Sequence, residues 1–361
     1  MATERHGLGY RTVVTGAMQA IDASHGEGGG QVLRTALALS VALGRPVTLR
    51  HIRERRPRPG LQPQHLTVVR ALAAISGAEV AGDALDSTEV AFSPRTLCGG
   101  TYRFDIGAIR GSAGSVSLLL QALLLPLSLA AQPSRLLLRG GTHVPWSPPV
   151  SYLTAVFVPA LGRIGVRAAI TLDRWGWYPA GGGEVGVSIA PGRPRHAIRW
   201  ERRTGTPAIE GLSAVSRLPR SIAERQRARA LDRLAAAGLS PTIAVVEDHT
   251  ARGPGTLAML TATGESAAAG FSALGRRGVR AETVADEAVD PLLEYLETGA
   301  TVDDHLADQL IPFLALADTP SAFTCPRIST HLRTVAWLVE QMLPVRVTLH
   351  EGRPGRVEVG L

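Results

Sequence analysis

A chain of 361 residues has room for two domains, or for one large domain with an insertion. Its apolar content of 45% supports a buried core, and its formal net charge of +7 favours a polyanionic partner, nucleic acid before membrane. All 38 basic residues are arginine, because the sequence contains no lysine. This excludes chemistry that depends on lysine: a P-loop, a protein kinase, a Schiff base or a lysyl adenylate. If the protein handles a nucleotide covalently, histidine becomes the leading nucleophile.

Cysteine content and apolar runs bear on the location of the protein. The two cysteines, Cys98 and Cys325, show no metal-binding spacing and fit a reducing cytoplasm. Residues 1–5 lack the apolar run of a signal peptide. The longest apolar stretch, Val116 to Ala131, is interrupted by a glutamine and a proline and is shorter than a membrane span, so we expect a buried helix there. These features predict a cytoplasmic protein with no membrane partner.

The first informative motif, Gly28-Gly29-Gly30, follows an expected N-terminal tail over 1–20 that leads into a strand. It opens a predicted helix over 31–43, closed by Gly44-Arg45-Pro46. A glycine turn at a helix N-terminus presents backbone N–H groups and the positive end of the helix dipole, which suits phosphate. Glu27 would repel phosphate there unless a divalent cation bridged the two, so it is a candidate metal ligand. The alternative is a tight turn with a solvated glutamate.

Four arginines fall within the Pro-containing segment 53–59, just before Gln64-His65. Guanidinium groups bind phosphate bidentately. The segment is therefore a candidate clamp for nucleic acid or triphosphate, with a solvated loop as the alternative.

Helices alternate with short β-like runs up to about residue 190. We expect helices over 31–43, 63–76, 112–130 and 150–164, and strands over 47–49, 89–92, 136–138 and 185–188. A second glycine triplet, Gly181-Gly182-Gly183, precedes the last of these strands. The two triplets look like corresponding parts of an internal repeat of roughly 80–90 residues.

A linker rich in Pro, Gly and Arg at 191–195 predicts a change of unit. Beyond it, Ser221 and Glu224 form a capping box that opens a strongly basic helix through Ala237, followed by strands over 242–246 and 256–261. The earlier pattern returns past 283, with helices near 284–297, over 302–317 and from 329, and with strands over 345–350 and 356–360. We therefore predict an α/β (α+β) main domain, 1–194 and 283–361, that carries a small α/β insert domain at 195–282.

Two histidines near the C-terminus are candidates for chemistry. His305, Asp308 and Gln309 share one helix face at i, i+3 and i+4, which is either a binding face or a solvated one. His331 falls in the first turn of a helix with an apolar stripe of Leu332, Val335, Leu338, Val339 and Met342. The dipole and burial both disfavour the imidazolium there and leave a neutral, nucleophilic ring; the alternative is a structural histidine.

From about residue 20 to the end, a series of motifs resembles the RNA 3′-terminal phosphate cyclase family. In chain order they are Glu27 to Arg34, Pro59-Gly60-Leu61 with Gln64-His65, Ser87-Thr88-Glu89, Ser112 to Ser115 with Gln121, Gly140-Gly141-Thr142, Tyr178 to Glu184, His305 to Gln309, and His331-Leu332. The resemblance implies three βαβαββ-type repeats, like those of the C-terminal domain of translation initiation factor three, with a small α/β insert in the last third.

The resemblance also implies an activity, the ATP-dependent conversion of an RNA 3′-phosphate to a 2′,3′-cyclic phosphate. In the family, a histidine at the His331 position attacks the α-phosphate of ATP and becomes adenylylated. AMP then passes to the RNA, giving RNA(3′)pp(5′)A, and the neighbouring 2′-hydroxyl displaces it. By the same resemblance, Glu27 would hold Mg²⁺ or Mn²⁺. Phosphate or RNA would contact Arg34, Arg53, Arg56 and Gln64, and ATP would contact Gln121, His305, Leu306, Ala307, Asp308 and Gln309.

Two positions depart from the family pattern: Trp175 stands where Arg or His is usual, and Ser151 where an acidic residue is expected. Two alternatives come from other classes of protein. One is the non-catalytic branch of the family, an RNA-binding ribosome-assembly factor, against which His331 argues. The other is an enolpyruvyl transferase, which shares the repeat architecture but typically uses lysines. The sequence leaves open the physiological RNA, the preferred metal and the oligomeric state, for which a dimer is one alternative.

Overall fold

The computed structural model describes residues 18–194 and 196–360. The expected tail up to residue 17, with the segment compared with a signal peptide, and Arg195 of the linker lie outside the described residues. Within them, each helix is either too short or too polar to cross a membrane.

The first four-stranded sheet shows the unit from which the chain is built. Its elements are β1 (Gln19–Asp22), α1 (Gln31–Leu43), β2 (Val47–Arg50), α2 (Pro63–Ser76), β3 (Glu79–Ala81) and β4 (Val90–Ser93). The strands are ordered β1-β2-β4-β3, with β1 and β2 parallel and β4 antiparallel to both of its neighbours. Gly44 and Gly77 are left-handed (φ 65° and 58°) and end α1 and α2, because a residue without Cβ adopts this conformation at least cost.

The same succession of elements occurs in a second repeat. It consists of β5 (Thr101–Asp105), the short η1 (Ile106–Ala108), α3 (Val116–Ser128), β6 (Ser134–Gly140), a helical stretch, β7 (Ala168–Arg174) and β8 (Gly183–Ile189), with sheet order β5-β6-β8-β7. The helical stretch is α4 (Val150–Tyr152), a π-helical turn η2 (Leu153–Phe157) and α5 (Val158–Arg163).

A third repeat closes the chain with β9 (Arg199–Trp200), α8 (Asp304–Leu314), β14 (Ser321–Cys325), α9 (Thr330–Met342), β15 (Arg346–His350) and β16 (Gly355–Gly360). Its sheet order, β9-β14-β16-β15, repeats that of the other two sheets. The predicted fold class, three βαβαββ units with an insert, is confirmed.

The insert interrupts the third repeat between β9 and α8. Its elements are β10 (Ala208–Ser216), α6 (Arg220–Ala236), β11 (Thr242–Asp248), β12 (Gly255–Thr263), β13 (Ala268–Leu274) and α7 (Ala281–Thr298), and its sheet order is β11-β10-β12-β13. It has a hydrophobic core of its own, to which Val284, Leu292 and Tyr295 of α7 contribute. The sequence pattern assigns residues from 283 onward to the main domain; because α7 packs on this core, we propose that the insert extends to about Ala300.

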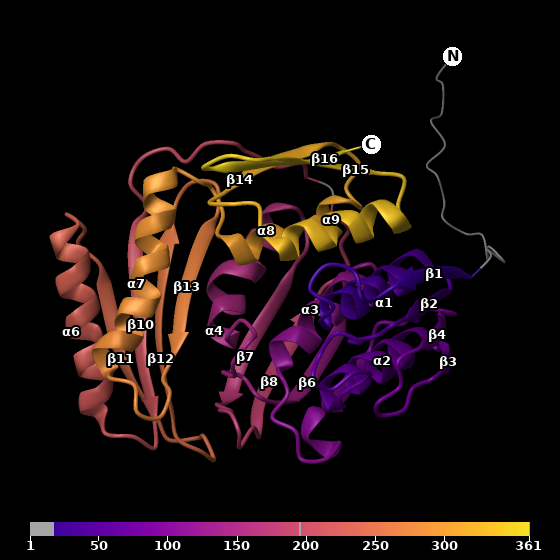
Figure 1. Ribbon diagram of the computed structural model, residues 1–361, viewed down its shortest axis with the longest axis horizontal. Coiled ribbons are helices and arrows are strands. Elements are labelled where there is room, and N and C mark those ends of the chain that lie inside the picture. The colour runs from indigo at the N-terminus through magenta and orange to yellow at the C-terminus, as the bar shows by residue number, and fades with distance from the viewer. Residues whose placement is uncertain (1–17, 195, 361) are drawn as a thin grey trace.

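Helices of the repeats pack against one another in the interior, while the sheets lie outside them (Figure 1). A single hydrophobic core runs through the three repeats, from Leu33 and Leu37 of α1 through Leu123 of α3 to Leu310 of α8 and Leu338 of α9. α3 is almost wholly buried, as its apolar sequence predicts. The apolar stripe predicted on the helix of His331 is buried as well. The N-terminal ends of α1, α8 and α9 adjoin one cavity, to which Gln31, His305 and His331 contribute.

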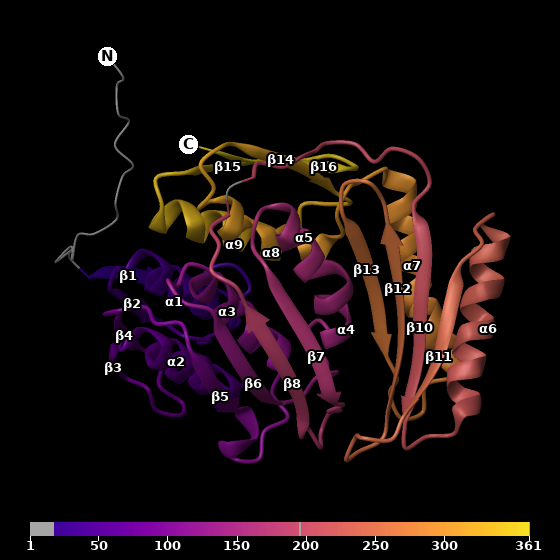
Figure 2. The same cartoon turned by 180° about the vertical axis from the view of Figure 1, so that it is seen from behind.

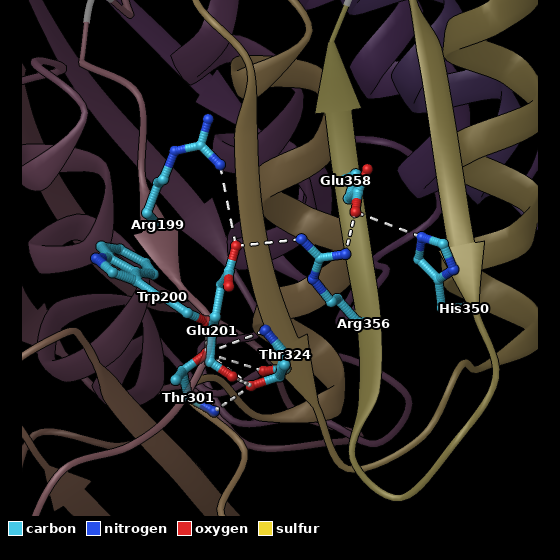
Figure 3. A network of polar contacts seen from close by, with 8 residues as sticks. All are labelled: Arg199, Trp200, Glu201, Thr301, Thr324, His350, Arg356 and Glu358. Atoms are coloured by element: carbon cyan, nitrogen blue, oxygen red, sulfur yellow. Dashed lines mark hydrogen bonds and ion pairs between the residues drawn. The ribbon is translucent and has the colours of Figure 1, made fainter.

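The insert is attached to the third sheet through Thr324 of β14 (Figure 3). Thr301, where the chain leaves the insert, donates from Oγ1 to the carbonyl oxygen of Trp200, 2.6 Å away, where the chain enters it. The hydroxyl of Thr324 donates to the carbonyl of Glu201 at 3.2 Å. On the same sheet Arg356 bridges Glu201 and Glu358, and Glu358 faces His350. The entry and exit of the insert are thus held side by side.

A second contact joins the far end of the insert to the second repeat. The lower ends of the β7–β8 hairpin and of the insert strands lie side by side in both views (Figures 1 and 2). The Trp175 backbone N–H donates to Thr250 Oγ1 at 3.1 Å, and Trp177 Nε1 donates to Ser216 Oγ at 2.7 Å. The insert is therefore held at both ends.

Two sequence-based expectations about local structure are wrong. The glycine triplets are not equivalent, because 28–30 joins β1 to α1 whereas 181–183 leads from β7 into β8. Both turns use left-handed glycines, including Gly28 (φ 58°) and Gly181 (φ 59°). Such glycines occur in many kinds of turn, so the shared motif does not show that the two segments are equivalent parts of a repeat. The capping box is also wrong: α6 begins at Arg220 after Pro219 and has no side-chain cap, so Ser221 lies inside the helix.

Candidate functional site

A cavity of about 410 Å³ lies where the three repeats and the insert meet. Its polar wall comes from α1, α3, α8 and the start of α9, with Gln31, Arg34, Gln121, His305, Asp308, Gln309 and His331. Apolar surface comes from the 146–149 loop, the β13 segment Gly270–Ser272 and Phe313. Its size is in the range of small-molecule and cofactor sites.

His331 stands at the edge of this cavity, in the first turn of α9, whose N-cap is Ser329. Its Nδ1 is 2.9 Å from Gln31 Oε1, and Gln31 Nε2 in turn donates to Asp308 Oδ2 at 2.6 Å. Because an amide oxygen only accepts, Nδ1 carries the proton and Nε2 of the neutral ring keeps its lone pair. Burial lowers the pKa of His331, an effect that Glu27 opposes and Arg34 and Arg56 reinforce. The ring is therefore a neutral base with a fixed tautomer.

Asp308 and Arg34 are the two buried charges beside this histidine. Burial raises the pKa of Asp308 to about 7 although Gln31 and Arg34 favour its ionised form. Burial lowers the pKa of Arg34 to about 10, and Asp308 opposes the shift. Arg34 remains cationic at neutral pH and supplies a positive charge inside the cavity, where low solvent access strengthens its attraction for an anion.

Glu27 faces His331 across a short gap. Its Oε2 lies 3.2 Å from His331 Nε2 and 3.7 Å from Arg56 Nη2. With Nδ1 protonated, the carboxylate and the lone pair of Nε2 point at each other, an arrangement that a cation between or beside them relieves. Within residues 18–194 and 196–360 no three His, Cys, Asp or Glu side chains cluster as a metal site. A single carboxylate fits Mg²⁺, which commonly binds one or two carboxylates together with substrate phosphates.

Two buried amide atoms in the cavity have no hydrogen-bond partner among the described residues. They are the donor Gln121 Nε2 and the acceptor Gln309 Oε1. Leaving such atoms unpaired costs free energy, so a ligand with a matching acceptor and donor is favoured here. A purine base with an exocyclic amino group offers that pair, as glutamine does for adenine in nucleic-acid recognition.

α8 is held in place by its N-cap, Asp303, which is buried. Its carboxylate accepts hydrogen bonds from the backbone N–H groups of His305 and Leu306. It also accepts from the Tyr152 hydroxyl of the second repeat and from the Gly270 N–H of the insert. One carboxylate thus fixes the position of His305 and Asp308 relative to the second repeat and the insert.

The arginine segment 53–58 and the start of α2 flank the glycine turn. A Cβ on Gly29 would lie 3.1 Å from Arg56 Nη2, and one on Gly30 would clash with the Arg34 and His65 side chains, so only glycine allows this approach. Arg53 donates to the carbonyl oxygens of Arg58 and Gly60 and thereby shapes its own loop. Burial and the nearby Arg34 lower the pKa of His65 to about 3, so it is neutral.

The structure brings most of the predicted site residues together. Glu27, Arg34, Arg56, His305, Asp308, Gln309, Gln121 and His331 surround or adjoin the cavity. Gln64 lies further along, where its Oε1 accepts from the Ser115 N–H at 2.8 Å. Leu306 and Ala307 are fully buried on the core side of α8 and do not line the cavity. The roles of all these residues stay predictions.

Sequence reasoning missed Gln31 as a site residue in its own right. It contacts both His331 and Asp308. Because 300 residues separate Gln31 from His331, no local pattern pointed to the pair. The feature of the sequence that could have identified Gln31 is its place within the motif Glu27 to Arg34.

The two departures from the family pattern meet at one buried residue, His143. The Trp175 ring stacks on it, with centroids 4.2 Å apart and planes 7° apart, and Ser151 Oγ lies 3.2 Å from its Nε2. Burial lowers the pKa of His143 to about 3, so it is neutral. Neither Trp175 nor Ser151 lines the cavity, and together they form a packing unit between the second repeat and the insert.

The fold and the cavity define an α/β protein of three βαβαββ repeats with a ligand-sized cavity at their junction. Comparison with known proteins makes this specific: the family described as RNA 3′-terminal phosphate cyclase matches residues 25–349. The chain belongs to this family.

Relatives that carry the name RNA 3′-terminal phosphate cyclase match nearly the whole chain. The protein of Methylococcus capsulatus is 45% identical over 347 residues, which cover 94% of this chain and 95% of the relative. Those of Gloeothece citriformis and Pyrobaculum neutrophilum are each 43% identical, over 91% and 92% of this chain and 95% of each relative. The enolpyruvyl transferase NikO from Streptomyces tendae is 18% identical over 49% of this chain and 33% of its own, with a TM-score of 0.29, which is too low to carry an argument.

Proposed function

We propose that the protein is an ATP-dependent RNA 3′-terminal phosphate cyclase, which acts through a histidyl-AMP intermediate. The observation that carries the proposal is the state of His331, a neutral ring with Nδ1 held by Gln31 and Nε2 directed to the group of charges at the cavity mouth. Family membership and the names of the relatives support the overall reaction. The histidine geometry supports the covalent route.

In the first step, His331 Nε2 attacks the α-phosphorus of ATP. The Nε2–P bond forms, the bond from the α-phosphorus to the bridging oxygen breaks, and pyrophosphate leaves. Attack requires an unprotonated Nε2, which the hydrogen bond from Nδ1–H to Gln31 provides. As Nε2 bonds to phosphorus the ring becomes cationic, and the Gln31–Asp308 pair stabilises that charge through Nδ1.

In the second step, an oxygen of the RNA 3′-phosphate attacks the same phosphorus, the N–P bond breaks, and RNA(3′)pp(5′)A forms. In the third, the neighbouring 2′-hydroxyl attacks the 3′-phosphorus, loses its proton, and AMP leaves with the bridging oxygen. The cyclic phosphate results. Arg34 and Arg56 lie beside the glycine turn next to Glu27 and neutralise phosphate oxygens in these steps.

Glu27 would hold a divalent cation, Mg²⁺ or Mn²⁺, which would neutralise phosphate charge when bound. Without a cation, the carboxylate faces both the nucleophilic Nε2 and the incoming phosphates, which it repels. Glu27→Ala should therefore weaken adduct formation and, above all, its response to added Mg²⁺ or Mn²⁺. An unchanged metal response would remove Glu27 from this role.

The proposal is tested by incubating the protein with α-labelled ATP and measuring acid-labile label on the protein. Wild type should form the adduct, whereas His331→Ala should form none and should not cyclise an RNA 3′-phosphate. His350→Ala is the matched control, because His350 is a surface histidine on β15 beside Glu358. A pre-adenylylated RNA needs only the last displacement, so we expect the His331 variant to close it.

Two outcomes would contradict the proposal in different ways. An adduct formed at the wild-type rate by His331→Ala would place the nucleophile elsewhere, with His305 the next candidate. A wild-type protein that binds RNA but forms no adduct would favour the non-catalytic, RNA-binding branch of the family.

A further inference from the structure

A series of loops, one rich in arginine and two rich in glycine, leads from the candidate site to the far end of the insert. We call it the loop track and define it by residues 53–58, 110–115 and 178–183 together with Arg217 and Arg252 of the insert. The first of these segments adjoins the site, because Arg56 contacts Glu27. The others lie outside the cavity and have no part in the chemistry above.

Gln64 at the start of α2 joins the 110–115 segment to the side of the site, and the later segments of the track contact one another directly. Gln64, next to His65 at the start of α2, binds the Ser115 N–H, and a Cβ on Gly114 would lie 2.9 Å from the Gln64 side chain. A Cβ on Gly181 would lie 3.0 Å from Ala113, and one on Gly182 would lie 2.9 Å from Arg252. The track therefore forms one uninterrupted surface from the second repeat to the insert.

The arginines at its far end have no carboxylate partner. Among the described residues, none lies within ion-pair distance of Arg110, Arg217 or Arg252, all of which are exposed. The nearby acids are already engaged: Glu184 pairs with Arg139 at 2.9 Å, and Asp248 accepts from Ser216, Thr250 and the Ala251 N–H. These exposed arginines of the track thus have no ion-pair partner among the described residues.

Backbone strain occurs at the same places. Arg53, Arg110 and Arg217 have positive φ values of 55°, 53° and 49°. A side chain in this region costs about 1 kcal/mol or more, and it persists where the surrounding structure and function require it. Arg217 is held by a hydrogen bond from Nε to the Ala251 carbonyl oxygen at 2.6 Å, next to Arg252.

An exposed aromatic ring accompanies the charges. Tyr178, at the start of the 178–183 segment, is 66% exposed, although most large apolar side chains of the described residues are buried. Exposed rings beside arginines bind single-stranded nucleic acid by stacking on its bases, while the guanidinium groups contact the phosphates.

We propose that the loop track binds the single-stranded RNA upstream of its 3′-terminal phosphate, so that the insert is a second RNA contact remote from the reacting atoms. This inference rests on the proposed function, since it takes the 3′ end to lie at His331. The phosphates follow the arginines, and Tyr178 receives a base.

The experiment compares two substrates, a 3′-phosphorylated dinucleotide and a 3′-phosphorylated single strand of about 15 nucleotides, near the largest site size of single-strand-binding grooves. Cyclisation is measured against salt for wild type, Arg252→Ala and Arg217→Ala/Arg252→Ala. Arg227→Ala is the matched control: it removes one exposed arginine without a carboxylate partner in the described residues from the same insert, but from α6, on the other side of the insert sheet.

We expect the double variant to raise KM for the long RNA roughly 10-fold, and to lower the slope of log(kcat/KM) against log[salt] by about 0.7 for each arginine–phosphate interaction removed. With the dinucleotide, the variants and wild type should have the same KM and the same salt slope. The control should match wild type in both quantities with both RNAs. Equal KM values and salt slopes for wild type and the double variant on the long RNA would overturn the inference. Adduct formation with ATP tests the proposed function separately, because it uses no RNA: a wild type without adduct contradicts the proposed function, whereas normal adduct formation with equal KM values and salt slopes contradicts the loop track alone.

Discussion

Two arginine-rich regions of this molecule look alike in sequence and differ in structure. The segment 53–58 has four arginines and one glutamate, and α6 has five arginines with one glutamate and one aspartate. On α6, Arg225, Arg229 and Arg233 pair with Glu282, Asp286 and Asp290 of α7 at 2.7–2.8 Å. In the segment 53–58, Arg56 is 3.7 Å from Glu27, and Arg53 bonds to carbonyl oxygens.

The difference shows that local charge does not define an anion site; the position of the carboxylates does. The α6 arginines are four residues apart, on one helix face, and the acids of α7 have the same spacing, so the two rows match. Such pairs fix the packing of two helices and leave little field for a ligand. In the segment 53–58, Arg56 instead shares its acidic partner, Glu27, with His331, and the segment keeps its positive field near the cavity.

The largest effect within this comparison is expected from replacing an arginine beside the candidate site. Arg56→Ala should lower the rate of adduct formation or of RNA cyclisation about 10- to 100-fold, because the variant lacks one charge-assisted hydrogen bond to phosphate. It should also flatten the salt dependence of the affected step. Arg225→Ala, which removes a solvent-accessible arginine from α6, is the control and should retain wild-type activity. Equal losses in both variants would mean that net charge, not position, governs the reaction.

A second test removes the acidic partners of the α6 arginines, so that α6 presents free positive charge. The triple variant Glu282→Gln, Asp286→Asn, Asp290→Asn leaves three arginines without acidic partners. We expect several-fold tighter binding to single-stranded RNA, with a salt slope steeper by up to about 0.7 per freed arginine, and no gain in cyclisation. Fluorescence anisotropy with a labelled RNA measures the binding. Unchanged affinity would show that this face cannot reach RNA even when its charge is free.

A smaller effect is expected on stability. Arg233 contacts both Asp286 and Asp290 and is 30% exposed in its side chain, so Arg233→Ala should lower the free energy of unfolding by about 1 kcal/mol. Its activity should equal that of wild type. Denaturant unfolding followed by circular dichroism provides the measurement. An unchanged midpoint would mean that hydration of the separated charges fully compensates for the loss of the ion pairs.

The last test separates two carboxylates by the sign of their pH dependence. The hydrogen bond from Arg225 lowers the pKa of Glu282 to about 2, so its contribution to stability is present above about pH 4.5 and is lost as the pH falls toward 2. Burial raises the pKa of Asp308 to about 7, so its contribution is present below about pH 3.8 and is lost as the pH rises through 7.

Unfolding of Glu282→Gln and Asp308→Asn across this pH range tests these signs. Relative to wild type, the Asp308 variant should gain stability between pH 4 and 7, and the Glu282 variant should lose its deficit below pH 4.5. Parallel curves for a variant and wild type would contradict the sign given for that residue.

Local signals in the sequence were sufficient for much of the fold. Gly44 and Gly77 mark the ends of α1 and α2, and Pro63 the start of α2, because these residues restrict the backbone by themselves. The strand β10 was missed: its nine residues include Gly211 and two serines, and pairing with both β11 and β12 holds it in place. That pairing depends on the whole sheet, which no short window contains.

The site was predictable to the extent that each residue carried its own signal. His331 has a helix start and an apolar stripe, and Glu27 has a glycine turn. The hydrogen-bonded series from Asp308 through Gln31 to His331 depends on three separate helices, α8, α1 and α9, coming together. The ion pairs of the basic helix α6 could not be predicted for the same reason, because its acidic partners lie on α7, more than 50 residues away.

The attachment of the insert has a consequence for how the chain can vary. The hydroxyl of Thr301 donates a hydrogen bond to the carbonyl of Trp200, so the chain leaves the third repeat and returns to it at one point. The insert of about 100 residues therefore connects two neighbouring positions that a single turn could also connect. A module joined this way can be lengthened, shortened or replaced in a lineage without disturbing the register of the three sheets. The cavity needs the insert as a wall, since Gly270 to Ser272 belong to it. Variation in this module therefore acts on which ligands enter, while the reacting groups stay where the repeats hold them.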